Sequence, residues 1–241
     1  MISPPIGQEY QRTHWTLRLL ANRLSRIGVH VLRFDYRGVG DSYGSPQQVA
    51  SLNEWQEDLE TAIDFLKKRT DCDAVMLLGL RFGAMLSCKV AQDRSDVHSL
   101  VAWEPVSNGD LYLRELRAMH QTMIDLWSAP VPMLRDEETE ELLGTRYRHE
   151  LLDEIEVSRL QWERLEVPQL VVHPAAIPED VGSDSVPWQR RISTDDSLDW
   201  GALSKLEIAW LRQKTCHRLA KAIGEMFTRL EHRELLAGAM G

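Results

Sequence analysis

One short segment constrains the fold of this chain more than any other. An apolar run, Ala74–Leu78, leads into Gly79-Leu80-Arg81-Phe82-Gly83, and the small and apolar residues Ala84–Cys88 follow. A short apolar run bounded by glycines is typical of a buried strand, and the residues after it favour a helix. The glycines mark a sharp turn between the two. The segment therefore predicts a strand, a bend occupied by Arg81, and a helix.

Strand-like and helix-like segments alternate through the first half of the chain. Helical spacing of apolar residues covers Trp15–Ile27 and Trp55–Lys68, and β-like runs cover Val29–Asp35, Ala74–Gly79 and Ser99–Glu104. Alternation of this kind predicts a mainly parallel sheet with helices on both faces.

Between residues 109 and 164 the alternation of strand-like and helix-like segments stops. Leu111–Trp127 has helical spacing, and an acidic patch at Asp136–Glu138 precedes what we expect to be further helix. We interpret 109–164 as a helical cap insertion over the carboxyl edge of the sheet. On this interpretation residues 1–241 form one domain.

The last third predicts two further strands and a final helix. The apolar runs Val167–His173 and Leu206–Leu211 are strand-like, and helical spacing extends over His217–Leu236. Between the two runs, Ala175–Ser204 is rich in Pro, Ser, Asp and Gly, which predicts a loop.

Composition argues against several classes of protein. The net charge of −9 disfavours binding to nucleic acid or to acidic membranes. The three cysteines are scattered, which favours a reduced, cytoplasmic setting. No apolar stretch approaches the roughly 20 residues of a membrane span, and no signal peptide is recognised at the start. The sequence has no Gly-rich phosphate loop and no cluster with metal-ligand spacing, so we predict no cofactor and no metal.

Several segments resemble the α/β-hydrolase superfamily. Arg33–Ser42 resembles a strand-end motif of that superfamily, and Leu78–Ala84 resembles its G-x-S-x-G nucleophile elbow. The segments Pro4–Tyr10, Trp103–Val106 and Tyr112–Arg117 resemble the exosortase A system-associated hydrolases, which sit beside the serine aminopeptidase-like and dienelactone hydrolase-like branches. The resemblance implies an α/β-hydrolase fold.

The resemblance also carries an expectation about the amino terminus. In that fold a segment like Pro4–Tyr10 follows the third strand, which lies between the fourth and the fifth. Only Met1–Ser3 precede it here. A central strand cannot be absent without exposing unpaired edges on both neighbours. We therefore expect amino-terminal strands of the natural protein to be missing from this sequence.

The elbow departs from the family pattern at its middle position, where Arg81 replaces serine. A guanidinium stays protonated and has no lone pair with which to attack, so it forms no acyl-enzyme. It offers instead a rigid fork of donors that suits a carboxylate or a phosphate. A buried guanidinium needs a carboxylate partner. Arg81 could therefore pair with a local acid in a decayed site, grip the acid group of a ligand, or stand in a site that catalyses by another route, such as a water activated by histidine.

The resemblance also implies positions for an acid and a histidine. His217, just after the last predicted strand, matches the position of the family's catalytic histidine. The acid could be Asp180 (or its neighbour Glu179) in the loop after the preceding strand, or Glu104 at the end of an adjacent strand. Glu104 is also a candidate partner of Arg81, because adjacent parallel strands end at the same edge.

An oxyanion hole can persist without the serine because backbone amides form it. The resemblance places its donors at Phe82, beside the elbow glycines Gly79 and Gly83, and at Ile6. Taken together, the residues predict a hydrolase-family protein that lacks serine-type activity and binds a small acyl or anionic ligand. The alternatives are an active ester or thioester hydrolase with another nucleophile, and a non-enzymatic scaffold that binds a protein.

Overall fold

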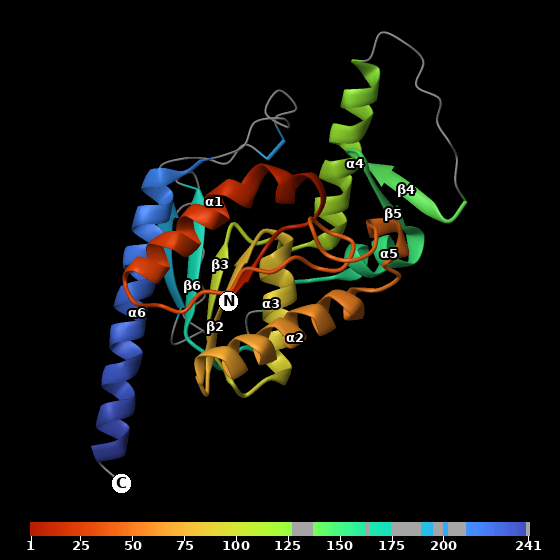
Figure 1. Ribbon diagram of the computed structural model, residues 1–241. Coiled ribbons are helices and arrows are strands. Elements are labelled where there is room, and N and C mark those ends of the chain that lie inside the picture. The colour runs from red at the N-terminus through yellow and green to blue at the C-terminus, as the bar shows by residue number, and fades with distance from the viewer. Residues whose placement is uncertain (127–136, 162–163, 175–188, 195–199, 202–210, 240–241) are drawn as a thin grey trace.

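The centre of the molecule is a parallel β-sheet. The computed structural model describes residues 1–126, 137–161, 164–174, 189–194, 200–201 and 211–239. Within this part of the chain the sheet has the order β1-β2-β3-β6-β7, and every neighbouring pair of strands is parallel (Figure 1). Its strands are β1 (Ile2–Ser3), β2 (Val75–Leu80), β3 (Val97–Trp103), β6 (Gln169–Pro174) and β7 (Gln189–Thr194). This arrangement confirms the predicted fold class.

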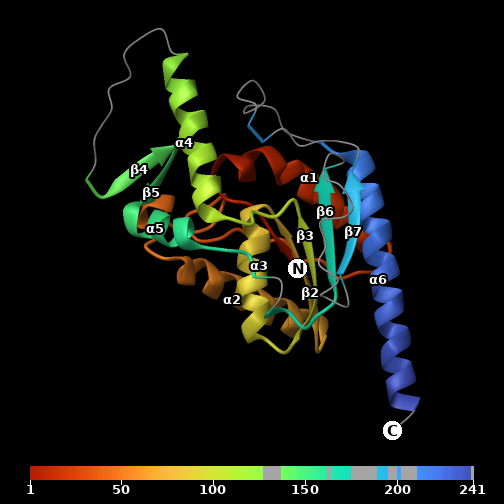
Figure 2. The same ribbon diagram turned by 180° about the vertical axis from the view of Figure 1, so that it is seen from behind.

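Helices cover both faces of the sheet, as Figures 1 and 2 show. One face carries α1 (Gly7–Arg26) and α6 (Gln213–Ala239), and the other carries α2 (Leu52–Thr70) and α3 (Phe82–Asp93). Successive residues of β2 alternate between the faces: Met76 and Leu78 pack in the core under α1 and α6, whereas Leu77 packs with α2 and α3. Strands buried on both faces read as continuous apolar runs, which is why β2 and β3 were predictable.

The segment between β3 and β6 contains α4 (Gly109–Asp125), the hairpin β4 (Thr139–Leu142) and β5 (Thr145–Arg148), and α5 (His149–Val157). The expected helix after the acidic patch is α5, but the hairpin, which was not predicted, comes before it. Its turn residues, Leu143 and Gly144, have φ of 51° and 82°. Positive φ at both central residues is typical of the two-residue turns that join antiparallel strands.

Two further expectations need correction. Of the predicted strand Val29–Asp35, only Arg33 forms a β-bridge, with Ile2, because its neighbour β1 is just two residues long. The predicted loop 175–204 contains β7, a polar strand that pairs with β6 at the edge of the described sheet. Most of the predicted strand Leu206–Leu211 lies outside the described residues.

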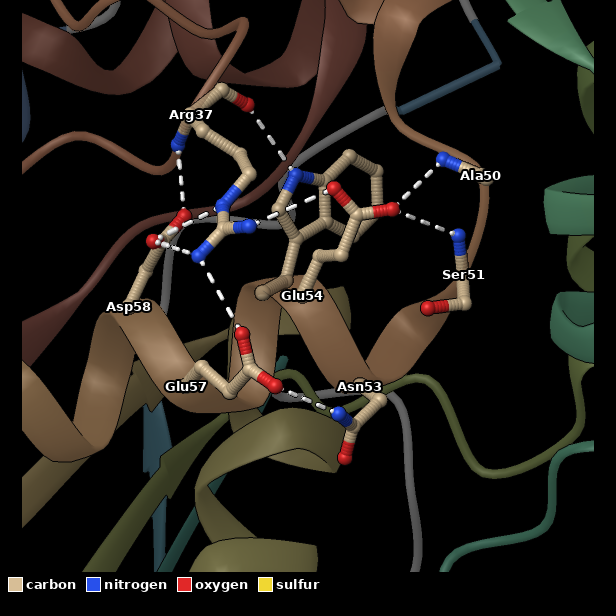
Figure 3. Close-up of polar contacts among 8 residues, drawn as sticks. Arg37, Ala50, Ser51, Asn53, Glu54, Glu57 and Asp58 are labelled. Carbon is tan, nitrogen blue, oxygen red and sulfur yellow. Dashed lines mark hydrogen bonds and ion pairs between the residues drawn. The ribbon is translucent and has the colours of Figure 1, made fainter.

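Arg37 holds the loop that follows Arg33 against helix α2 (Figure 3). The side chain of Arg37 donates to Asp58 Oδ1 from Nε at 3.0 Å and from Nη2 at 2.8 Å, and it also pairs with Glu54 and Glu57. Its carbonyl accepts a hydrogen bond from Trp55 Nε1. A short 3-10 helix, η1 (Pro46–Gln48), follows. These contacts hold the loop that the strand-end motif forms.

Among the described residues, no helix is both long enough and apolar enough to cross a bilayer.

Candidate functional site at the bend between β2 and α3

Arg81 occupies the bend itself. Strand β2 ends at Leu80, helix α3 begins at Phe82, and Arg81 between them has φ 53° and ψ −120°. A side chain rarely adopts this backbone conformation, which costs roughly 1–3 kcal/mol unless the surroundings impose it. Here the Arg81 amide donates to the carbonyl of Trp103 at 3.0 Å, and the Arg81 carbonyl accepts from Ala84 N at 3.0 Å. The bend is thus held from β3 and from α3.

Both glycines of the predicted elbow are required by close packing. A Cβ at Gly79 would lie 2.3 Å from Ala84 Cα, and one at Gly83 would lie 2.3 Å from the carbonyl oxygen of Pro4. The second contact places the segment before α1 directly against the elbow. Phe82 is the first residue of α3 and Ile6 immediately precedes α1, so the two expected amide donors come from segments that touch. Their role as an oxyanion hole stays a prediction.

The carboxylate that faces Arg81 belongs to Glu9, on the first turn of α1. Arg81 Nε donates to Glu9 Oε1 at 2.9 Å, and the two side chains are only 13% and 6% exposed. The hydroxyl of Tyr112, from α4, donates to the other oxygen of Glu9 at 3.3 Å. Burial raises the pKa of Glu9, while the charge and the hydrogen bond of Arg81 oppose that shift.

Two aromatic rings flank the guanidinium of Arg81. Its Cζ lies 4.7 Å from the centre of the Trp200 ring and 5.8 Å from that of Tyr112. Such contacts are attractive because the face of an aromatic ring carries negative charge density. Trp200 also contacts a second guanidinium, because Arg12 on α1 lies 5.8 Å from the same ring and donates from Nη1 to the Trp200 carbonyl at 3.1 Å.

Glu104, at the end of β3, bonds Trp200 rather than Arg81. Leu80 and Trp103 are register partners in β2 and β3, so Arg81 and Glu104 leave the sheet side by side, as predicted. Yet Glu104 Oε2 accepts from Trp200 Nε1 at 2.7 Å, and among the described residues its buried Oε1 has no hydrogen-bond partner. Burial raises the pKa of Glu104 to about 7, although the Trp200 hydrogen bond and the charge of Arg81 act in the opposite direction.

A cavity of about 450 Å³ opens beside this cluster. Its polar wall includes Arg81, Glu9 and Arg12. Its remaining lining comes largely from α4, the β4–β5 turn and the Trp200 segment, through Tyr112, Leu116, Met119, Leu143 and Trp200. The lining of the cavity therefore combines charged side chains from α1 and the bend with apolar and aromatic side chains from α4, the turn and Trp200.

The structure does not bring the expected histidine to this cavity. His217 lies in the first turns of α6 with an exposed side chain, and it lines a different cavity together with Arg23 and Lys221. Asp180 and its neighbour Glu179 fall outside the described residues. Of the predicted site residues, the structure therefore gathers Arg81, Glu104, Phe82, Ile6 and the two elbow glycines at one edge of the sheet. Within the described part of the chain, no group of three or more His, Cys, Asp or Glu side chains could hold a metal ion.

Four residues of the cluster were not anticipated from the sequence: Glu9, Arg12, Tyr112 and Trp200. A signal existed for Glu9, because it lies three residues after Ile6, in a segment already expected beside the elbow. Tyr112 and Trp200 come from segments after β3 and β7, and their placement depends on how those segments pack over the sheet.

Comparison with known proteins shows which family the chain belongs to. Residues 10–156, more than half of the chain, match the family described as serine aminopeptidase, S33. The chain belongs to this family of α/β-hydrolases. The matched range includes the bend with Arg81 and its two flanking glycines.

Individual relatives are more distant. The uncharacterized protein YfhR of Salmonella typhi is 38% identical over 72 residues, which are 29% of this chain and 22% of that protein. The chain thus spans about a fifth of the length of this curated relative. Est1E from Butyrivibrio proteoclasticus, solved with ferulic acid, has a TM-score of 0.61 at 16% identity and covers 95% of this chain and 87% of its own. An esterase of Pyrococcus furiosus has a TM-score of 0.60 at 15% identity, with coverage of 95% and 80%. At these identities the likeness of the structures shows the fold alone.

Proposed function

We propose that this α/β-hydrolase lacks serine-type hydrolytic activity and binds a small acyl or anionic ligand in the cavity beside Arg81. Serine chemistry needs a hydroxyl at the elbow and a histidine that removes its proton. Arg81 supplies no hydroxyl, and the ring that accompanies it is the indole of Trp200, which donates its N–H to Glu104. An indole is a donor only and cannot shuttle a proton as an imidazole does.

One observation carries the binding part of this proposal. Among the described residues, Arg81 Nε bonds Glu9, whereas Nη1 and Nη2 have no hydrogen-bond acceptor. Arg81 lines the cavity of about 450 Å³. Volumes of about 300–1,000 Å³ are typical of small-molecule sites. The guanidinium therefore has donors left for a ligand that enters the cavity.

The test of the first part of this proposal is a measurement of hydrolytic activity. The purified protein is incubated with a fluorophosphonate probe and with p-nitrophenyl butyrate, beside an active serine esterase as control. We expect no labelled serine and no hydrolysis above background. Labelling of any serine by the fluorophosphonate would contradict the proposal.

A second candidate function is ester hydrolysis by an activated water. Glu104 favours it, because a carboxyl group whose pKa lies at about 7 suits a general base at neutral pH. Hydrolysis that resists the fluorophosphonate and disappears in Glu104→Gln would support this route. Glu104 is not among the residues that line the cavity, which is why binding without hydrolysis is the better-supported proposal. Membership of the exosortase A system-associated group stays a prediction that rests on the segments Pro4–Tyr10, Trp103–Val106 and Tyr112–Arg117.

A further inference from the structure

We infer that the cavity next to Met1 is a slot for one extended, apolar strand, and that this strand is a segment joined to the Met1 nitrogen by a peptide bond. The slot lies between residues 29–32 and β2, where it continues the path of β1. The inference is independent of the proposed function. It gives a place, a register and a composition to a central strand that the sequence led us to expect before Met1.

The short strand β1 already lies between two neighbours. Ile2 pairs with Leu78 of β2 on one side and forms a bridge with Arg33 on the other. The amino group of Met1 donates to the Met76 carbonyl at 2.9 Å, and the Met1 carbonyl accepts from Leu78 N at 2.9 Å. Before Met1 (at N in Figure 1) the path of β1 continues as a cavity of about 940 Å³.

The neighbour that contains Arg33 is itself strand-like. Val29 and Val31 pack in the core under α1 and α6, whereas Leu32 and Phe34 pack in the core with α2 and α3. This alternation between the two faces is that of an extended strand. Val29 and Val31 line the cavity from one side, and β2 lines it from the other. The cavity therefore has strand-like chain along both of its sides.

The backbone of these walls suits a strand better than an aliphatic ligand. In a parallel ladder a residue directs its amide and its carbonyl to the same edge, so Met76 turns both toward the path of β1. The register of β1 and β2 makes the second residue before Met1 the acceptor for the Met76 amide. An aliphatic ligand would fill the space but would leave such backbone groups without a partner, which is costly in a buried place.

The side chains around the cavity are apolar on both faces of the sheet. Leu24 of α1 and Ile223 of α6 line it on one face, and Leu66 of α2 lines it on the other. Arg26 and Lys221 also belong to the lining, but both are exposed to solvent. Strands that are buried on both faces consist of continuous apolar runs. We therefore expect the occupant to be rich in Val, Ile and Leu.

The nitrogen of Met1 occupies the position of a strand amide. Met1 is only 7% exposed, and burial lowers the pKa of its amino group from 8.0 to about 5, because the charged form is poorly solvated there. A peptide bond at this nitrogen would remove the charge and keep the hydrogen bond to Met76. A strand from another molecule would instead bury a second chain end against Met1, and a buried ion pair seldom repays its desolvation.

The experiment extends the 241-residue chain by three residues, which the register places opposite Met76, Val75 and Ala74. One variant carries Val-Ile-Val before Met1, and the matched control carries Ser-Gly-Ser, each behind a new start methionine. Both extensions turn the Met1 ammonium into an amide, so they differ only in how well they form and bury a strand. We expect Val-Ile-Val to raise the midpoint of thermal unfolding by at least about 5 °C above the control.

Hydrogen exchange gives a local readout. With Val-Ile-Val in the slot, the Met76 amide should exchange at least about tenfold more slowly than in the Ser-Gly-Ser control. The Val75 amide is the internal reference, because it donates to the Asp96 carbonyl with or without the extension. A third variant, Val-Pro-Val, keeps an apolar segment but lacks one strand amide, and it should lose most of the stabilisation.

Three results would overturn the inference. The first is equal unfolding midpoints, or equal Met76 exchange, in the Val-Ile-Val and Ser-Gly-Ser chains. The second is failure of the Val-Ile-Val chain to fold. The third is a dimer of the unextended chain in sedimentation, with its Met76 amide protected as the concentration rises, because a second copy would then occupy the slot. None of these results bears on the proposed function, which the fluorophosphonate measurement tests separately.

Discussion

Arg81 and Glu9 stabilise the molecule only as a pair, because each buried charge depends on the other. Removing one partner of a buried ion pair costs about 3–5 kcal/mol, since the remaining charge stays buried and uncompensated. We therefore expect Glu9→Ala to lower the free energy of unfolding by about that amount. The double variant Arg81→Gln, Glu9→Gln should lose less than Glu9→Ala alone. Urea unfolding of the three proteins measures this, and a double variant less stable than the single one would contradict it.

Restoring the hydroxyl at the bend should not restore hydrolysis. The Arg81→Ser variant regains the nucleophile of the motif, but the group beside it is Trp200, and His217 lines a different cavity. Without a base the hydroxyl stays protonated and a poor nucleophile. We expect no release of p-nitrophenol above background from the folded variant, with or without Glu9→Gln. Labelling of Ser at this position by a fluorophosphonate would show that a base reaches it after all.

Residue chemistry alone predicted that a carboxylate must face Arg81, but it could not say which one. Glu104 was a sound candidate because strand register places it beside the bend, and it does lie in the same cluster. Glu9 lies 72 residues away along the chain, and its position depends on how α1 packs. Glu104 in turn bonds Trp200, which is 96 residues distant. Which side chains pair across two elements depends on how the elements pack, and the local sequence pattern does not show this.

At the scale of elements, the junction of β1, β2 and α3 depends on the absence of a side chain at Gly83. A Cβ there would lie 2.3 Å from Pro4 O and 2.5 Å from Ser3 O, and both obstacles are backbone. Gly83→Ala should therefore destabilise the protein by about 2 kcal/mol or more, as overpacking does. Gly224→Ala is the matched control, since Gly224 lies within α6 and its nearest neighbour is the flexible end of Ile27 at 3.3 Å.

The control should be neutral or stabilising by up to about 1 kcal/mol, because alanine favours helix over glycine. Thermal unfolding of the two variants tests the contrast. Equal effects of Gly83→Ala and Gly224→Ala would show that the segment before α1 can move away from the elbow.

Elements whose own sequence carries a pattern could be predicted, whereas elements that depend on a neighbouring element could not. Strands β2 and β3 are buried throughout most of their length and could be identified from their apolar runs alone. Strand β7 has the sequence Gln-Arg-Arg-Ile-Ser-Thr, which carries no such signal, and it exists because β6 offers an edge to pair with. The β4–β5 hairpin was missed because its turn, Leu143-Gly144, contains only one residue that favours positive φ.

At the scale of the whole molecule, two acids with shifted pKa values, Asp96 and Glu104, make stability depend on pH in two separate ranges. Hydrogen bonds from Arg94 lower the pKa of Asp96 well below its usual value. Its contribution is therefore complete above the ordinary Asp pKa and is lost as the pH falls further. Glu104 has the opposite effect on the pH dependence of stability, because burial raises its pKa from 4.5 to about 7. Between these values the folded state binds more protons than the unfolded state, so stability falls as the pH rises.

Glu104→Gln should isolate this second window. At about 1.4 kcal/mol per pKa unit, ionisation of Glu104 destabilises the wild type by about 3 kcal/mol once the pH exceeds 7. Glutamine keeps an acceptor for the Trp200 N–H and carries no charge. The variant should therefore match wild type near pH 5 and exceed its stability near pH 8 by roughly that amount. Glu57→Gln, an exposed acid on α2, is the control and should follow the wild-type curve. Equal slopes of unfolding free energy against pH for wild type and Glu104→Gln would mean that Glu104 is solvated well enough to ionise at its ordinary pKa.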